Sequence, residues 1–438
     1  MTFDRSNEIF RIQGAKPLRG RVRVDGSKNA ALPILAASLA VDGTVQLRQI
    51  PDLTDIDTMC QLLSQLGAHI CRDTAAGTVE IRNSAQESME APYDLVSRMR
   101  ASVCVLGPLL SRFGRARVSL PGGCNIGHRP IDLHLRGLAA LGADIRIERG
   151  YIIAESRILK GCDLVLSGPE GSTVTGTCNV LCAAATAVGR TVIRAAACEP
   201  EVEDLAAFLN AAGADIQGAG TSTIEVTGVR HLNAVAHSVI PDRIEAATLA
   251  IAAAITSGDV EIINAPTESL QSIRTALDQI GVCQSVINSD VEVTWRVSAE
   301  AAGELRPVEL IALPYPGIPT DAQAQLMALL SLAGGTSVIT DRVFPDRFMH
   351  AAELVRMGAD IRVTAGTAII RGVDRLTGAT VMASDLRASA ALVLAAMAAE
   401  GTSEIRRVYH IDRGYAGFER KLNQLGACIQ RLSGPNPD

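Results

Sequence analysis

Apolar residues along the chain repeat one pattern, in which a helix with leucines three or four apart is followed by a glycine and a short strand. The pattern ends in Leu-x-x-x-Gly-Ala-x-Ile and occurs at residues 63–70, 138–145, 209–216, 354–361 and 422–429, with a degenerate copy at 277–284. The leucine spacing predicts one apolar helix face, and the glycine predicts the helix stop. Alternating residues such as 144–147 then predict a half-buried strand.

These six copies predict the domain organisation. Their glycines are 68 to 77 residues apart, a period longer than that of solenoid repeats, so each copy should be a small α/β subdomain. Six subdomains predict two domains of three, with a boundary near residues 238–242. A leading strand within 14–24 would join the C-terminal half. We therefore expect an N-terminal lobe over 24–240, with a lid loop at about 118–130, and a C-terminal lobe over 1–23 and 241–438.

Composition narrows the classes of function. The chain has 438 residues, of which 47% are hydrophobic and 3% aromatic, so its cores must consist mainly of Ala, Val, Leu and Ile. A net charge of −6 argues against a general nucleic-acid binder. Lysine occurs four times, and arginine supplies the other positive charges. Because arginine binds carboxylates and phosphates through two donors, a small anionic ligand is indicated.

The cysteines and the N-terminus indicate a cytoplasmic protein. Ten cysteines without regular paired spacing do not form a disulfide framework, and no CxxC or HExxH motif accompanies them. The first eleven residues contain no apolar leader segment, and no apolar run is long enough to span a bilayer. We expect a monomer with reduced thiols, no metal, no other cofactor, and neither membrane nor nucleic acid as partner.

A glycine-rich stretch at 120–134 surrounds one cysteine. Gly122 and Gly123 precede Cys124, so this thiol is expected on a mobile lid loop. Arg129, with His128 beside it, would adjust the reactivity of the thiol. The alternative is a tight turn with a buried structural cysteine.

Two cationic positions in the N-terminal half stand at predicted helix starts. Lys28 follows a strand and Gly26 and opens an Ala/Leu helix, where backbone N–H groups and the helix dipole attract anions. An exposed lysine is the alternative, and the absence of a Gly-Lys dipeptide excludes a Walker A loop. Arg100 introduces an apolar helix over 103–110, where a solvated helix end is the alternative.

The C-terminal half repeats the theme with an acid and three arginines. Asp321 stands at a Pro-bounded helix start, where Thr320 or Asp321 caps the helix or, alternatively, Asp321 acts as a general base toward a ligand hydroxyl. Arg347, Arg387 and Arg413 each lie at a loop–helix junction. One such arginine is ordinarily a cap or an ion pair, but three in one half indicate an anion site.

Taken together, these motifs resemble the family of UDP-N-acetylglucosamine enolpyruvyl transferases. The matching stretches, in order along nearly the whole chain, are GSKNAALPILAA, APYDLVSRMRAS, LPGGCNIGHRPIDLH, PDRIEA, PGIPTDAQAQ, DRFMH, DLRASAALV and HIDRGY. The resemblance implies two inside-out α/β barrel domains, each of three repeated subdomains. It also implies transfer of the enolpyruvyl group of phosphoenolpyruvate to the 3′-hydroxyl of the sugar of UDP-N-acetylglucosamine. Phosphate is released, in the first committed step of peptidoglycan synthesis.

The resemblance further implies a role for each candidate residue. It makes Cys124 a lid acid that can bond covalently to the donor and is the target of fosfomycin, and Asp321 the group near the acceptor hydroxyl. The remaining residues are substrate contacts: Lys28, Arg129 and Arg413 for the donor phosphate, Arg347 and Arg387 for its carboxylate region, Asn29 for the sugar, Arg100 and Val343 for either substrate, and the backbone of Arg129, Pro130, Ile131, Asp132 and Leu133 for the uracil. Lys28 and Arg413 are implied to be catalytic as well.

One stretch departs from the family pattern. Family members carry a lysine and a Ser-Val-Gly-Ala-Thr run that contacts the nucleotide diphosphate, whereas residues 171–177 here read Gly-Ser-Thr-Val-Thr-Gly-Thr without the lysine. Hydroxyls and backbone N–H groups could replace it. Three alternatives stay open: a paralogue acting on another uridine nucleotide, a shikimate-type enzyme, and a catalytically silent protein that binds a nucleotide sugar.

Overall fold

The computed structural model describes residues 7–83, 89–121, 131–169, 171–289, 292–299 and 304–433. Its contacts divide the described chain into two compact units. The N-terminal unit holds residues 26–240, and the C-terminal unit holds the residues up to 25 and from 241 onward.

The described residues form six four-stranded sheets, three in each unit, that share one connectivity: a parallel pair is extended by two antiparallel strands. In sheet order, the strands of the N-terminal unit are β16 (Leu232–Ser238), β3 (Val41–Arg48), β5 (Thr78–Asn83), β4 (Ala68–Asp73); β6 (Glu90–Ala91), β7 (Arg115–Ser119), β9 (Tyr151–Glu155), β8 (Asp144–Glu148); and β10 (Asp163–Val165), β13 (Arg190–Arg194), β15 (Thr223–Thr227), β14 (Asp215–Gln217). A small hairpin adds β11 (Ser167–Gly168) and β12 (Gly171–Ser172). Those of the C-terminal unit are β2 (Arg19–Arg23), β17 (Asp259–Ile263), β19 (Val293–Ser298), β18 (Cys283–Asn288); β20 (Glu309–Ala312), β21 (Thr336–Asp341), β23 (Thr367–Arg371), β22 (Asp360–Thr364); and β24 (Thr380–Met382), β25 (Thr402–Arg406), β1 (Glu8–Gln13), β26 (Cys428–Ser433).

Each sheet is accompanied by one inner and one outer helix. The inner helices are α1 (Lys28–Ala37), α4 (Leu106–Phe113), α6 (Val174–Ala184), α8 (Arg243–Ile255), α10 (Thr320–Leu330) and α12 (Leu386–Ala398). The outer helices are α2 (Thr54–Gln65), α5 (Asp132–Ala140), α7 (Pro200–Ala211), α9 (Gln271–Ile280), α11 (His350–Arg356) and α13 (Phe418–Gln424). Short turns complete the described helices: α3 (Tyr93–Val96), η2 (Ser38–Ala40), η3 (Arg100–Val105), η4 (Thr267–Leu270) and η5 (Val408–Arg413).

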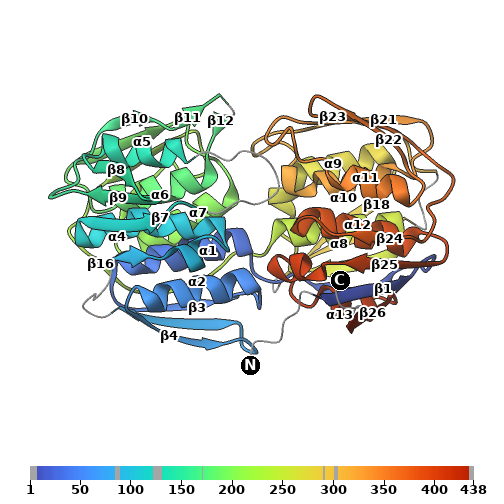
Figure 1. Ribbon diagram of the computed structural model, residues 1–438, viewed down its shortest axis with the longest axis horizontal. Coiled ribbons are helices and arrows are strands. Elements are labelled where there is room, and N and C mark those ends of the chain that lie inside the picture. Colours follow the sequence, from blue (N-terminus) through green and yellow to red (C-terminus); the bar gives the residue numbers. More distant parts are fainter. Residues whose placement is uncertain are drawn as a thin grey trace. The chain divides into compact units, whose positions relative to one another are not determined.

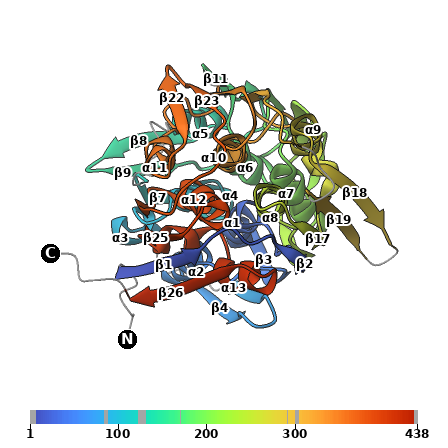
Figure 2. The ribbon, with the colours of Figure 1, turned by 90° about the vertical axis from the view of Figure 1, so that its right-hand side faces the viewer.

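The inner helices form the core of each unit. All residues of α8 are buried, and α8, α10 and α12 contact one another. Figure 2 shows these three helices in the middle of the C-terminal unit with its sheets around them, and Figure 1 labels α1, α4 and α6 in the N-terminal unit. The sequences of α8 and α12 are rich in alanine and largely apolar, which is the composition of a helix buried on every face. Among the described helices, none combines the length and the apolar character that a bilayer crossing requires.

The repeat glycines end the outer helices, as the sequence pattern predicts. Gly67, Gly142, Gly213, Gly281, Gly358 and Gly426 follow the six outer helices, and each has φ between +91° and +105°. The residue after the glycine bonds back to the repeat leucine, as in Ala359 N to Leu354 O at 3.1 Å and Ala427 N to Leu422 O at 3.1 Å. This is the left-handed helix stop that turns the chain directly into the next strand.

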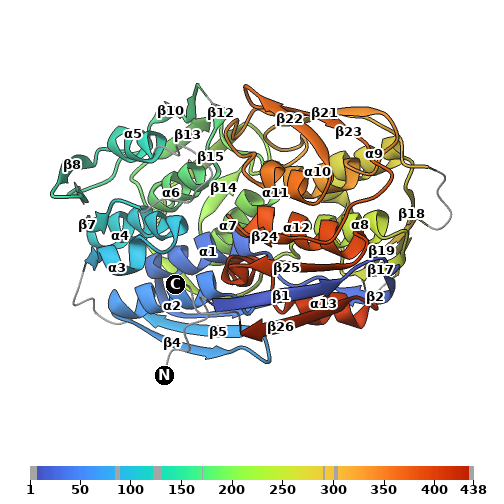
Figure 3. The same ribbon diagram turned by 45° about the vertical axis from the view of Figure 1, so that its right-hand side comes forward.

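The first two strands belong with the C-terminal unit. β2 pairs in parallel with β17, and β1 lies between β25 and β26, where Figure 3 shows blue ribbon beside red. The chain then enters the N-terminal unit at Gly26 and returns after Ile240.

Candidate active site

Asp321 is the centre of a charged cluster in the C-terminal unit. It is the second residue of α10, and its carboxylate accepts hydrogen bonds from Arg347 Nη1 at 2.7 Å and from Arg387 Nη2 at 3.2 Å. Arg347 is 6% exposed and Arg387 1%, whereas the Asp321 side chain is 26% exposed. A partly accessible carboxylate is therefore fixed between two buried cations.

Local structure explains how these residues meet. Arg387 is the second residue of α12, and Asp385 caps that helix by accepting from the N–H groups of Arg387 at 2.9 Å and Ala388 at 3.2 Å. Arg347 lies in the turn before α11 and approaches Asp385 through Nη2 at 3.8 Å. Since α10 and α12 pack together as inner helices, their N-termini bring Asp321 and Arg387 within hydrogen-bonding distance.

Arg387 keeps unused donors. Its Nε and Nη1 are buried and have no hydrogen-bond partner among the described residues, and its guanidinium carbon lies 5.1 Å from the ring centroid of Tyr415. Burial alone would lower the pKa of Arg387, but Tyr415, Asp321 and Asp242 raise it above its ordinary value, so the group stays cationic. Unpaired buried donors cost free energy, which a bound anion would recover.

The start of α10 differs from the capping arrangement considered for Thr320 and Asp321. Pro319 precedes the helix, and no side chain caps it. Thr320 instead donates to Asp341 Oδ2 at 2.6 Å, and Asp341 Oδ1 accepts from the N–H of Val343 at 2.9 Å. The capping interpretation is therefore wrong, and Asp341 links the helix start to the loop that carries Val343.

Two histidines stand beside these cations. Burial lowers the pKa of His350 to about 4, with Arg347 lowering it and Asp385 raising it, so this imidazole is neutral at neutral pH. Arg413, the last residue of η5, is half-buried and acts on His410, whose pKa burial and Arg413 both lower. Arg413 therefore adds positive charge near His410 in the same unit.

The other candidates with described positions lie in the N-terminal unit. Lys28 opens α1 and is 6% exposed, so the alternative of an exposed lysine is wrong. Its Nζ lies 2.9 Å from Oδ2 of Asp55, which is also buried. Asn29 is half-buried beside it. Arg100 is half-buried and opens η3, so the helix expected over 103–110 is instead divided between η3 and α4.

The stretch proposed to hold the uracil is described in part. Ile131 is half-buried and precedes α5, Asp132 is exposed, and Leu133 is buried. Cys124, Arg129 and Pro130 lie outside the described residues.

Sequence reasoning missed several partners of these side chains. Asp55, Asp341 and Tyr415 were not predicted, because each meets its partner through tertiary packing and not through local spacing. Asp385 alone carried a local signal, since an aspartate directly before an apolar helix is a common N-cap.

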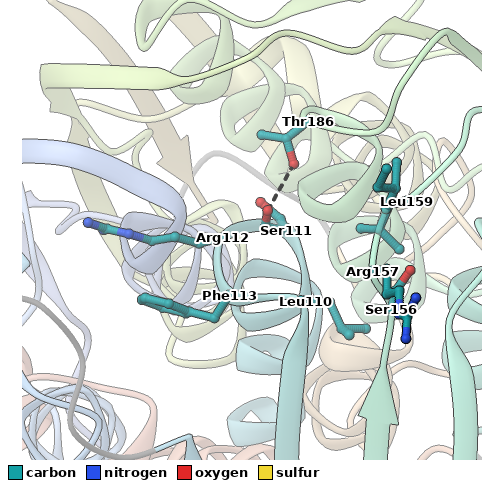
Figure 4. A pocket seen from close by; sticks show the side chains of 10 residues that line it. Leu110, Ser111, Arg112, Phe113, Ser156, Arg157, Leu159 and Thr186 are labelled. Carbon is teal, nitrogen blue, oxygen red and sulfur yellow. Dashed lines mark hydrogen bonds between the residues drawn. The ribbon is translucent and has the colours of Figure 1, made fainter.

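A separate pocket of about 550 Å³ lies in the N-terminal unit, at the end of α4 (Figure 4). Ser111, Arg112, Arg157 and Thr186 are among its lining residues, and Thr186 Oγ1 donates to the carbonyl of Ser111 at 3.3 Å. Among the predicted site residues with described positions, none lines it, and the Asp321 cluster lies in the other unit.

Comparison with known proteins relates the chain to named enzymes. The profile of the EPSP synthase (3-phosphoshikimate 1-carboxyvinyltransferase) family matches residues 12–422. A UDP-N-acetylglucosamine 1-carboxyvinyltransferase from Sorangium cellulosum is 52% identical over 428 residues, which cover 98% of this chain and 99% of that protein. One from Methylacidiphilum infernorum is 49% identical over 425 residues, covering 97% of this chain and 99% of that protein.

Solved structures of enolpyruvyl transferases have the same fold as this chain. The enolpyruvyl transferase NikO from Streptomyces tendae superposes with a TM-score of 0.87 at 29% identity, covering 98% of this chain and all of that one. An EPSP synthase from Acinetobacter baumannii gives a TM-score of 0.74 at 20% identity over 97% of this chain, a likeness of fold. The expected fold, two inside-out α/β barrels of three subdomains each, is confirmed. The chain therefore belongs to the family of UDP-N-acetylglucosamine 1-carboxyvinyltransferases, within the wider EPSP synthase family.

Proposed function

We propose that this protein transfers the enolpyruvyl group of phosphoenolpyruvate to the 3′-hydroxyl of the sugar of UDP-N-acetylglucosamine and releases phosphate, a step of peptidoglycan synthesis. The observation that carries the proposal is the Asp321 cluster, in a chain about half identical to enzymes of that name over nearly its full length. Asp321, Arg347 and Arg387 supply one base and two fixed cations for a highly anionic donor.

Arg387 is suited to bind the donor carboxylate. Its buried Nε and Nη1 have no acceptor within the described residues, and Nη1 can donate a charge-assisted hydrogen bond to one carboxylate oxygen of the donor. Because Asp321 and Tyr415 fix the guanidinium beforehand, little reorganisation is needed when the anion arrives.

Asp321 is suited to act on the acceptor hydroxyl. Its two oxygens each accept one arginine hydrogen bond, so the carboxylate stays ionised and is held at the start of α10. The arginines hold the carboxylate in place, and its exposed fraction lets a substrate reach it.

The reaction also needs an acid. The donor methylene carbon takes up a proton, the 3′-oxygen attacks C2, and the C2–phosphate bond then breaks as the methylene loses a proton again. We assign the acid to Cys124 and contacts with the donor phosphate to Lys28, Arg129 and Arg413. Since Arg129 follows Cys124 by five residues in the sequence, we expect a reactive thiol that the epoxide fosfomycin alkylates. Mass spectrometry should find the adduct on Cys124, and Cys124→Asp should resist; an unmodified wild-type protein would remove Cys124 from this role.

An alternative acceptor stays possible because of residues 171–177. Here Ser172 and Thr173 occupy the region where a lysine was expected, so another uridine nucleotide could replace UDP-N-acetylglucosamine. The silent binding protein is disfavoured, since Asp321 and its arginines are all present and form the cluster.

Phosphate release tests reaction and acceptor together. The wild-type protein is incubated with phosphoenolpyruvate and, in parallel, with UDP-N-acetylglucosamine, other uridine diphosphate sugars or 3-phosphoshikimate. We expect release with the first acceptor and little with 3-phosphoshikimate. Release with another uridine nucleotide alone would support the alternative, and no release with any acceptor would refute the transferase. The proposal includes a cytoplasmic monomer that needs no metal or other cofactor. Gel filtration tests the monomer, and phosphate release in the presence of a chelator tests the independence from metal.

A further inference from the structure

We propose that Asp341 is a positioning residue that holds the guanidinium of Arg347 so that its Nε–Nη2 edge stays free for the carboxylate of the donor. This inference rests on the proposed function and adds to it a residue that does not itself touch substrate. Asp341 is the last residue of β21, and Arg347 lies in the turn before α11. Two connections join them, one through the hydroxyl of Thr320 and one through the backbone of Phe344.

Asp341 is a buried carboxylate without an ion-pair partner among the described residues. It is 1% exposed, and its side chain is held by neutral donors. Oδ1 accepts from the N–H groups of Val343 at 2.9 Å and Phe344 at 2.8 Å, and Oδ2 accepts from Oγ1 of Thr320 at 2.6 Å. An asparagine oxygen could accept the two backbone bonds equally well, as in the common Asx turn. Only the bond from Thr320 requires a second oxygen, and therefore an aspartate.

The direction of the Thr320 hydroxyl follows from this bond. A carboxylate can only accept, so the hydrogen of Thr320 points to Asp341 and its oxygen keeps lone pairs for another donor. Nη1 of Arg347 lies 3.3 Å from this oxygen and 2.7 Å from Oδ1 of Asp321. Nη1 carries two hydrogens, and these neighbouring side chains at the start of α10 accept one each. Both hydrogens of Nη1 are therefore committed to α10.

The second connection fixes the backbone of Arg347. Asp341 holds the N–H of Phe344, and the carbonyl of Phe344 accepts from the N–H of Arg347 at 3.0 Å. The arginine is thus held at its backbone and at the end of its side chain, and it is only 6% exposed. Because its rotamer freedom is lost before a substrate arrives, substrate binding loses little further entropy at this residue.

The remaining edge of Arg347 suits a carboxylate. Nε and Nη2 make no hydrogen bond within the described ranges, and Nη2 approaches Oδ1 of Asp385 only to 3.8 Å. The same edge binds an aspartate elsewhere in this chain, where Nε and Nη2 of Arg194 each lie 2.9 Å from one oxygen of Asp163. Two parallel bonds of this kind make the pair strong and specific. Asp341 therefore leaves the fork of Arg347, and not a single N–H, for the donor.

A double-mutant cycle tests the connection through Thr320. In Asp341→Asn the amide keeps the turn, but its NH₂ group can only donate toward Thr320, whose hydrogen then has no acceptor. We expect the KM for phosphoenolpyruvate to rise roughly 5- to 30-fold, while the KM for UDP-N-acetylglucosamine stays within about 2-fold. Thr320→Val should raise the same KM, and Thr320→Ser should keep it within about 2-fold of wild type. In the Thr320→Val background, Asp341→Asn should add less than about 2-fold.

Ser331→Ala is the matched control for stability. Ser331 is a buried residue at the other end of α10, and its Oγ donates to the carbonyl of Met327 at 2.9 Å. Loss of this hydroxyl should lower the free energy of unfolding without changing either KM. A merely structural role of Asp341 would give Asp341→Asn the same behaviour, with lower stability and an unchanged KM for phosphoenolpyruvate.

Two results overturn the proposal. One is an unchanged KM for phosphoenolpyruvate in Thr320→Val; the other is an equal effect of Asp341→Asn in both backgrounds, which would show that Asp341 does not act through Thr320. Should Asp341→Asn fail to fold, the two Thr320 variants decide. A raised KM in Thr320→Val that Thr320→Ser does not show supports the connection, and equal KM values in the two variants overturn it.

Failure of the proposed function would be visible separately, because wild type would then release no phosphate with any acceptor. Calorimetric titration with phosphoenolpyruvate alone still measures how well the fork of Arg347 is held. An affinity that is weakened in Thr320→Val and kept in Thr320→Ser supports the proposal. Equal affinities of the two variants, or no binding to wild type, overturn it.

Discussion

Oδ1 of Asp321 lies 2.7 Å from Nη1 of Arg347, and its other oxygen is held by Arg387. The three residues come from α10, the turn before α11 and α12, and two of them are buried. The Asp321 side chain is 26% exposed, so a carboxylate whose position is fixed by two arginines stays accessible to a substrate hydroxyl.

Replacing Asp321 with asparagine should abolish most turnover. The amide keeps the shape but can no longer take up the proton of the acceptor, so kcat should fall roughly 10²- to 10⁴-fold. Phosphate release measures the effect, and Asp346→Asn, an exposed aspartate next to Arg347, is the matched control. A variant of Asp321 with nearly normal turnover would remove this residue from the role of base.

Replacing Arg387 with methionine should lower activity without lowering stability. Two buried donors of Arg387 have no partner among the described residues, and Asp321 keeps its bond to Arg347 when Arg387 is removed. We expect the free energy of unfolding to stay within about 1 kcal/mol of wild type or to rise, because a buried charge is expensive. Phosphate release should fall by at least roughly 10²-fold.

Urea denaturation and the release assay measure the two effects of Arg387→Met. The matched control is Arg356→Met, an exposed arginine on α11. A large loss of stability with activity retained would make Arg387 a structural residue.

The buried pair of Lys28 and Asp55 should matter for stability. Both side chains are less than a tenth exposed, and Asp55→Ala leaves the lysine without this carboxylate. Breaking such a pair should lower the free energy of unfolding by about 3–5 kcal/mol. Glu148→Ala, which breaks the exposed pair with Arg146, should cost less than about 1 kcal/mol. If denaturation experiments give the same loss of free energy of unfolding for both variants, burial does not strengthen the Lys28–Asp55 pair.

Glu245 should make stability depend on pH. Burial raises the pKa of this carboxyl from 4.5 to about 7, against the lowering effect of Lys421, whose Nζ lies 2.6 Å away, while Asp25 also raises it. The folded state therefore binds this proton more tightly than the unfolded state. The contribution of Glu245 is fully present below about pH 4.5 and is lost as pH rises to about 7.

A pKa shift of this size changes the free energy of unfolding by about 3 kcal/mol between the two ends of that pH range. Glu245→Gln should remove this slope, as denaturation at about pH 5 and about pH 8 will measure. If wild type and variant differ by the same amount at both pH values, Glu245 does not titrate in this range.

The repeat could be predicted from sequence because its determinants are local. The helix stop at Gly358, for example, needs positive φ, and its leucine lies four residues earlier in the chain. The six glycines therefore mark outer helix and strand in every subdomain. The inner helices were harder to recognise as such, because alanine-rich segments such as α8 are buried on all faces and show no period.

The site could be predicted in its residue types but not in its geometry. Asp321, Arg347 and Arg387 were each identified, yet 66 residues separate the first from the last, and spacing gives no measure of their distance in space. Local reasoning offered a capping role for Thr320 or Asp321 as one alternative, whereas the Thr320 hydroxyl donates to Asp341, twenty-one residues away. Contacts made by tertiary packing leave no local pattern, so the sequence could not indicate them.

The most direct test of the central claim is the identity of the product. Wild-type protein is incubated with phosphoenolpyruvate carrying ¹³C in its three-carbon unit and with UDP-N-acetylglucosamine, and the nucleotide is analysed by mass spectrometry and NMR. We predict a nucleotide heavier by one labelled enolpyruvyl group, attached at the 3′-oxygen of the sugar, with one phosphate released per product. A nucleotide sugar recovered unlabelled while phosphoenolpyruvate remains intact would contradict the account.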